Sequence, residues 1–128
     1  MNGSGGTNLR FPRSFRLLKR ADFLQVQSAG SRISTENFIF LYRLNELKHF
    51  RCGFTVSRKN GNAVRRNRIR RRMKEAVRLN IPQIISLSVD IVCLPKTRII
   101  DTPFAKLVTE ISDFISILES RIPGVRIV

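Results

Sequence analysis

Residues 58–78 form the most strongly basic stretch of the chain and read RKNGNAVRRNRIRRRMKEAVR. This stretch holds ten of the 24 Lys and Arg residues and a single acid, Glu75, so it supplies +9 of the formal net charge of +15. Like charges at helical spacing repel one another, so an anionic partner is needed to relieve the repulsion. Most of these residues are arginines, whose planar guanidinium matches phosphate geometry and stacks on bases. The chemistry that this stretch favours is nucleic-acid binding.

Residue types that could perform catalysis or hold a metal ion are sparse. His49 is the only histidine, and its polar turn predicts an ordinary exposed side chain. The nine acids are scattered, so no carboxylate cluster suited to magnesium is evident, and Gly61 does not belong to a glycine-rich phosphate loop. Cys52 and Cys93 lie in apolar segments far apart, which indicates free buried thiols. We therefore expect no catalytic residue, no metal ligand and no cofactor bound by the chain itself.

The composition predicts one domain. A length of 128 residues with 42% hydrophobic residues is sufficient for a real core. We expect a flexible leader over residues 1–9, a single RNA-binding domain over residues 10–120 and a C-terminal tail over residues 121–128. The chain has no apolar run of membrane-spanning length and its start lacks the apolar core of a signal peptide. We therefore expect a cytoplasmic protein without a membrane partner.

Apolar spacing and turn residues predict the elements that position the basic stretch. Helices are expected over residues 20–29, from Asn62 to about Leu79, and from residues 101–103 to about 118. Strands are expected over residues 37–44, 50–57 and 89–94, with a further short strand near 31–33. Residues 45–49 are expected to form a polar turn, and Pro82 ends the second helix. This pattern predicts an α/β (α+β) fold.

The second helix presents two different faces. One stripe is apolar and must face the core; it contains Ile69, Met73, Ala76 and Val77. A neighbouring stripe is basic and contains Arg66, Arg70, Lys74 and Arg78, with Arg65, Arg68 and Arg72 broadening the basic surface. A lone helix can enter the major groove of duplex DNA, but the chain shows no zipper heptads, zinc-finger spacing or helix-turn-helix order. Folded RNA is the favoured partner, and the buried stripe argues against a membrane-surface helix.

The strand before this helix has one small, polar face. Cys52, Phe54 and Val56 point one way, whereas Gly53, Thr55 and Ser57 point the other way. That face could form a floor for a passing single strand. Aromatic residues near it are candidates for either the core or a base-stacking platform, with the core the more ordinary role; they are Phe23, Phe38, Phe40, Tyr42 and Phe54.

The basic stretch closely resembles the signature of the bacterial ribonuclease P protein subunit. That family carries a Gly-Asn-Ala-x-x-Arg-Asn-Arg-hydrophobic-basic-Arg run, which stands here at residues 61–71. The family's Gly-x-x-Val-Ser-basic-basic strand ending is similar to residues 53–59, and RLLKRADF at residues 16–23 is similar to the family's start. The resemblance covers about residues 15–118. It favours this family over another basic RNA-binding protein such as a ribosomal component.

The resemblance implies a two-layer sandwich with three helices on a four-stranded sheet in the order α-β-β-β-α-β-α. It also implies a left-handed crossover around the basic helix, against the general rule. By the same resemblance, the chain pairs with the ribonuclease P RNA subunit, which holds magnesium ions and performs the endonucleolytic removal of the 5′ leader from precursor tRNA. The protein clamps RNA and holds the leader in a cleft between the first helix and the sheet, and no protein partner is required.

Carried over position by position, the motif implies RNA contacts at Arg58, Lys59, Arg65, Arg66, Asn67, Arg68, Arg70, Arg71 and Lys74. The leader cleft is expected to include Phe23, Leu41 and Ser57. Gln27 and Leu41 stand where relatives often carry aromatic residues, so the cleft should stack less and hydrogen-bond more. Arg72 stands where relatives often carry an apolar residue, so the buried stripe should be narrower here.

Overall fold

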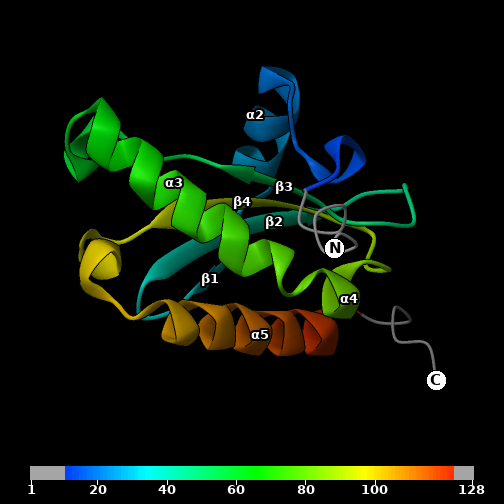
Figure 1. Cartoon of the computed structure of the whole chain (residues 1–128). Coiled ribbons are helices and arrows are strands. Elements are labelled where there is room, and N and C mark those ends of the chain that lie inside the picture. The colour runs from blue at the N-terminus through cyan, green and yellow to red at the C-terminus, as the bar shows by residue number, and fades with distance from the viewer. Residues whose placement is uncertain (1–10, 123–128) are drawn as a thin grey trace, which may run out of the picture.

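The computed structural model describes residues 11–122, which form a four-stranded mixed sheet with helices on both faces (Figure 1). The helices are α2 (Arg20–Ala29), α3 (Ala63–Arg78), α4 (Ile81–Ile84) and α5 (Phe104–Arg121), with 3-10 turns η1 (Arg13–Phe15), η2 (Arg58–Asn60) and η3 (Thr97–Asp101). The strands are β1 (Ser31–Ser34), β2 (Phe38–Leu44), β3 (Arg51–Phe54) and β4 (Val89–Pro95). The predicted leader at residues 1–9 and residues 123–128 of the predicted C-terminal tail lie outside the described residues.

The sheet places the basic helix in a crossover. The strand order is β1-β2-β4-β3; β2 pairs antiparallel with β1 and β4, whereas β3 and β4 are parallel. Because parallel neighbours cannot be joined by a tight hairpin, the chain must cross over between them, and α3 and α4 form this connection. The predicted α+β class is confirmed, and the elements follow the predicted order with α4 as an addition.

Three element boundaries differ from prediction for local reasons. Strand β3 ends at Phe54 rather than Ser57, because residues 57–61 close into η2 through hydrogen bonds to the carbonyls of Ser57 and Arg58. Strand β4 extends to Pro95, which pairs with Phe38. The last helix begins at Phe104, since residues 97–101 form η3 instead of its first turn.

The main core lies between the sheet and helices α3 and α5. Side chains of the predicted apolar stripe of α3 are all buried there, which confirms that stripe. Phe38, Phe40 and Tyr42 of β2 point into the same core, and the rings of Phe40 and Phe114 stack with centroids 3.8 Å apart. The core role, taken as the more ordinary one for these strand aromatics, is therefore confirmed. Each fully buried ring contributes about 1.5–3 kcal/mol.

A smaller cluster lies on the opposite face of the sheet, under α2. Leu17, Val26 and Val92 are buried in it, and Phe23 and Leu41 pack against it. Val26 is the one buried residue of α2. This face of the sheet therefore contributes much less apolar burial than the face covered by α3 and α5.

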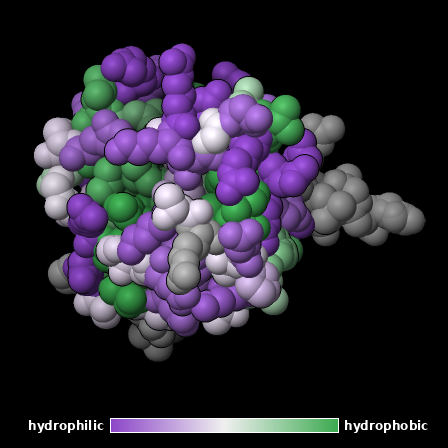
Figure 2. Space-filling model, turned by 90° about the vertical axis from the view of Figure 1, so that its left-hand side faces the viewer, coloured by the Kyte–Doolittle hydropathy of each residue, from purple (hydrophilic) through white to green (hydrophobic). Residues whose placement is uncertain are grey.

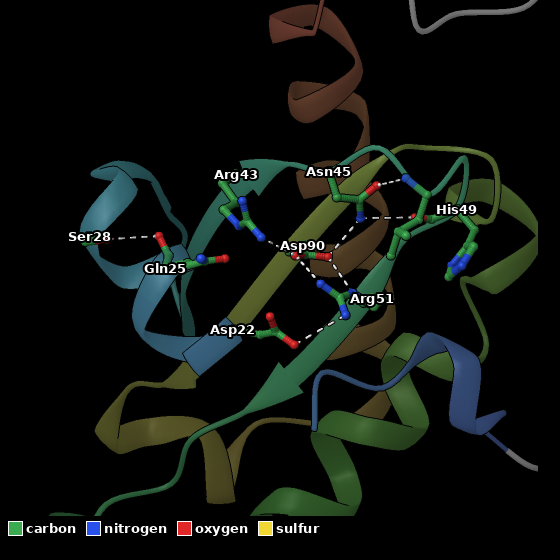
Figure 3. A network of polar contacts seen from close by, with 9 residues as sticks. Asp22, Gln25, Ser28, Arg43, Asn45, His49, Arg51 and Asp90 are labelled. Atoms are coloured by element: carbon green, nitrogen blue, oxygen red, sulfur yellow. Dashed lines mark hydrogen bonds and ion pairs between the residues drawn. The ribbon is translucent and has the colours of Figure 1, made fainter. Parts of the chain in front are cut away.

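A buried carboxylate links three strands beside that cluster. Asp90 of β4 is fully buried and accepts hydrogen bonds from Arg51 of β3, at 2.9 and 2.7 Å, and from Asn45 at 2.8 Å (Figure 3). Arg43 of β2 lies 3.4 Å from the same carboxylate. Burial by itself would raise the pKa of Asp90, but these hydrogen bonds and positive charges hold the pKa below its ordinary value.

We expect Asp90→Asn to lower the free energy of unfolding by about 3 kcal/mol, because it removes the charge that compensates two partly buried arginines. Since the folded-state pKa lies below the unfolded value, this stabilisation is complete above the unfolded pKa, about 4, and is lost as the pH falls through the folded-state pKa. Urea unfolding of wild type and variant between pH 7 and pH 2 checks both points. The exposed Asp113→Asn is the matched control, and parallel pH profiles for all three proteins would contradict the prediction.

Candidate nucleic-acid interface

Helix α3 starts from a side-chain cap that fixes where its basic face begins. Asn62 Oδ1 accepts a hydrogen bond from the backbone N–H of Arg65 at 2.9 Å, as the predicted N-cap requires. Gly61 precedes the cap with φ 112°, a left-handed backbone conformation that favours glycine, and the side chain of Arg65 folds over it. The turn η2 exposes Arg58 and Lys59 beside this helix start.

The predicted RNA-contact residues gather on the side of α3 that faces away from the core. Arg65, Asn67, Arg68 and Arg71 are exposed, and Arg66, Arg70 and Lys74 are half-buried. Arg70 donates a hydrogen bond to Asn67 Oδ1 at 2.8 Å, so the amide of Asn67 is oriented with its NH₂ group free to donate elsewhere. The burial of Ile69, Met73 and Val77 leaves this basic surface no orientation other than outward.

The last turn of α3 is electrostatically different from its start. Glu75 forms an ion pair with Arg78, and the hydrogen bond from Arg78 lowers the pKa of Glu75. Because Glu75 is the single acid of residues 58–78, its pairing with Arg78 leaves the positive charge concentrated in the first three turns of the helix.

Arg72 does not broaden the basic surface, and this prediction is wrong. Its guanidinium donates hydrogen bonds to the carbonyls of Ile99 at 2.8 Å and Ile100 at 3.2 Å, and also to that of Thr102. These carbonyls lie at the end of η3 and just after it, where the Ile99 carbonyl also accepts a hydrogen bond from the backbone N–H of Thr102. Arg72 therefore ties the segment between β4 and α5 to the middle of α3. Its distant partners explain why an arginine can stand in the place of an apolar residue.

A groove lies between α2 and the end of β3, with a volume of about 360 Å³. It is lined by Leu18, Arg20, Phe23, Leu24, Gln27 and Thr55. Seen from the side on which α3 begins, the surface carries hydrophobic side chains gathered in a hollow that hydrophilic side chains border (Figure 2). The lining therefore combines one aromatic ring, one guanidinium, one carboxamide and one hydroxyl with aliphatic groups.

Gly53 explains how Phe23 reaches the sheet. A Cβ atom at residue 53 would lie 2.4 Å from Cζ of Phe23, closer than any real contact allows. The ring therefore rests directly on the backbone of β3, half-buried, with Thr55 beside it in the same groove. The small, polar strand face expected at Gly53 and Thr55 lies under α2 as a result.

The other two expected cleft residues lie outside the groove lining. Leu41 of β2 packs under α2 against the small apolar cluster. Ser57 is exposed and lies beyond the end of β3, at the start of η2. Arg20, Leu24 and Gln27 line the groove instead. Arg20 and Gln27 lie three residues before and four residues after Phe23, and Leu24 lies four residues after Arg20. This spacing places them on one side of the helix, which is the sequence signal that identifies them.

Residues with potential chemistry of their own are held in structural roles. Cys52 and Cys93 are buried free thiols, as predicted, and burial raises the pKa of each, so neither is a reactive thiolate. His49 is half-buried against the ring of Phe15 rather than exposed. In the part of the chain that the structure describes, no three His, Cys, Asp or Glu side chains are grouped to hold a metal ion. None of the described helices is long and apolar enough to cross a membrane.

The fold and this surface define a small α+β protein whose basic residues are concentrated on one exposed face. The family model that matches the chain is Ribonuclease P, over residues 11–119. The ribonuclease P protein component of Citrifermentans bemidjiense is 41% identical over 106 residues, covering 83% of this chain and 90% of that protein. That of Bartonella quintana is 39% identical and covers 76% and 77%.

Solved structures agree with the sequence comparisons. The ribonuclease P protein of Thermotoga maritima is 31% identical with a TM-score of 0.72, over 85% of this chain and 98% of that chain. That of Staphylococcus aureus is 28% identical with a TM-score of 0.69, over 81% and 94%. The chain belongs to the ribonuclease P protein component family, and with it to the processing of tRNA; the ribosomal alternative is not supported.

Arg68 and Arg72 lie one turn apart on α3, so replacing each by Met separates RNA contact from structural bonding. Arg68→Met should weaken RNA binding by about 1–3 kcal/mol and reduce the log–log salt slope by about one, with the melting temperature unchanged. Arg72→Met removes the guanidinium donor from three backbone carbonyls, so it should lower the free energy of unfolding by about 1–3 kcal/mol at an unchanged salt slope. Salt-dependent binding and thermal melts check this, and a reduced slope for Arg72→Met at unchanged stability would contradict it.

Proposed function

We propose that this chain is the protein subunit of a cytoplasmic ribonuclease P holoenzyme. The exposed basic face of α3 binds the RNA subunit, and the groove beside α2 holds the single-stranded 5′ leader of precursor tRNA. The observation that carries this proposal is the continuity of the two surfaces. Residues 55–65 run from the groove at Thr55 through η2 to the start of the basic face at Arg65. One short segment therefore connects both RNA-facing surfaces.

The groove suits a single strand better than a duplex. Its volume of about 360 Å³ and its single ring match one stacked base rather than a helix. Phe23 offers a stacking face, worth about 1–3 kcal/mol per base. Arg20 at the rim supplies a cation for a phosphate, and the carboxamide of Gln27 and the hydroxyl of Thr55 supply hydrogen bonds. This lining supports the expectation that the site stacks less and hydrogen-bonds more.

The chain contributes binding rather than bond cleavage in this proposal. Phosphodiester hydrolysis with magnesium calls for clustered oxygen ligands, and the two buried acids of the described residues are instead bonded to other side chains: Asp90 to arginines and Glu110 to Asn37. We place the magnesium ions and the reacting atoms in the RNA subunit. The protein acts by lowering the charge repulsion between that RNA and the precursor, which matters most when magnesium is scarce.

A reconstitution experiment tests this division of roles. The purified chain added to a bacterial ribonuclease P RNA should restore 5′ maturation of precursor tRNA at a magnesium concentration at which the RNA alone is inactive. The chain without RNA should yield no matured 5′ end. The cleavage products are resolved on a sequencing gel, with heat-denatured chain as the control. Site-specific maturation by the chain alone, or no effect of the chain on the RNA, would overturn the proposal.

The groove can be tested first with a variant that leaves all of its lining residues in place. Gly53→Ala should displace the ring of Phe23, lowering the free energy of unfolding by about 1–3 kcal/mol and reducing the affinity gained from the leader. Adding Phe23→Leu removes the clashing ring atoms, so the double variant should regain stability but not leader affinity. Melting temperatures and holoenzyme affinities for precursor and mature tRNA are compared. Equal affinity losses on both tRNAs would remove Phe23 from the leader site.

A further inference from the structure

Helix α2 carries most of the groove lining, yet few apolar contacts hold it to the sheet. Val26 is its one buried residue, and the cluster beneath it contains only Leu17 and Val92 as further buried members. Lys19 at its N-cap position makes no side-chain capping hydrogen bond. Apolar burial is non-directional and here it is small, so the position of α2 depends strongly on the polar link at its first turn.

That link runs through Arg51. Its Nη1 lies 3.4 Å from Oδ2 of Asp22 in the first turn of α2, and both side chains are only 21% exposed. The same guanidinium donates two hydrogen bonds to the buried Asp90, so the sheet orients it from the other side (Figure 3). Because two hydrogen bonds to Asp90 hold the planar guanidinium of Arg51 in place, it cannot move with Asp22 if the helix shifts. The ion pair therefore defines one position for the start of α2.

The link acts on the groove from outside it. None of Asp22, Arg51 and Asp90 belongs to the groove lining. Asp22 and Phe23 are neighbours in α2, so their side chains leave the helix in different directions, one toward Arg51 and the other toward Gly53. A change at Asp22 therefore removes no group that could touch a ligand in the groove, but it frees the turn that holds Phe23.

We propose that Asp22 and Arg51 are positioning residues for the 5′ leader: their ion pair holds α2 at the spacing from the sheet at which the groove accepts a single strand. This inference rests on the proposed function of the groove. The pair contributes nothing to the contact between α3 and the RNA subunit, because it lies on the opposite face of the sheet. Its loss should therefore lower the leader's contribution to binding and leave the affinity for the RNA subunit intact.

Electrostatics and positioning predict opposite outcomes for Asp22→Asn. Removing a negative charge from an RNA-binding protein should, by charge alone, tighten binding to every RNA. We define the leader contribution as the Kd of the holoenzyme for mature tRNA divided by its Kd for precursor tRNA. Positioning predicts instead that this leader contribution falls about fivefold. Asp22→Glu keeps the charge and should retain most of the contribution. Glu36→Gln removes an equal charge from the ion pair with Lys106 and gives the electrostatic effect alone.

Arg51→Lys provides a second, independent variant. The lysine ammonium keeps a positive charge beside Asp90, but it cannot bond Asp22 and Asp90 at once in the way that the guanidinium does. It should give the same fivefold loss as Asp22→Asn. The single-turnover cleavage rate at saturating holoenzyme should not change in either variant, because the loss is in substrate binding. A leader contribution equal to that of wild type in both folded variants would overturn the positioning role. A wild-type holoenzyme without any leader contribution would instead overturn the proposed function of the groove.

Discussion

The burial of one apolar stripe of α3 is the constraint on which the exposed basic surface depends. A helix with nine net positive charges in and around it is electrostatically self-repelling and would not be stable alone. Burial of Ile69, Met73 and Val77 in the main core offsets that repulsion. The same burial leaves the arginines on the opposite side of the helix exposed to solvent. The hydrophobic core and the proposed RNA-binding surface are therefore two consequences of one helix orientation.

The topology of the sheet reinforces this orientation. Because β3 and β4 are parallel, the connection that contains η2, α3 and α4 must cross the sheet between them, and a strand stands at each end of this connection. Arg72 then ties the segment after β4 back to the middle of the helix through three backbone carbonyls. Because α3 is fixed at both ends and in the middle, its charged surface is rigid. A preorganised surface loses less conformational entropy when it binds a folded RNA.

Local patterns in the sequence were sufficient to predict the features that repeat with helical or strand periodicity. The stripe of α3, the cap at Asn62 and the alternating strand before it all follow from spacing within about 20 residues. Pairings between distant residues carry no such signal. Nothing near Asp90 in sequence indicates that it would be buried against Arg51, 39 residues away, and Arg72 reads as one more surface arginine until its partners near residue 100 are known. Ser57 and Leu41 lie outside the groove lining because the exact end of β3 and the placement of α2 decide which side chains line it.

The two faces of the sheet use different forces because they serve different purposes. Aromatic burial under α3 and α5 gives stability without direction, which suits a scaffold. Aromatic side chains packed under α2 would fill the space that the groove occupies. The position of α2 therefore has to be fixed with few buried apolar side chains. A buried carboxylate with oriented arginines gives less net stability than apolar residues of the same size, but its geometry is specific. The polar network of Asp22, Arg51 and Asp90 thus holds a helix in place beside a cavity that must stay open.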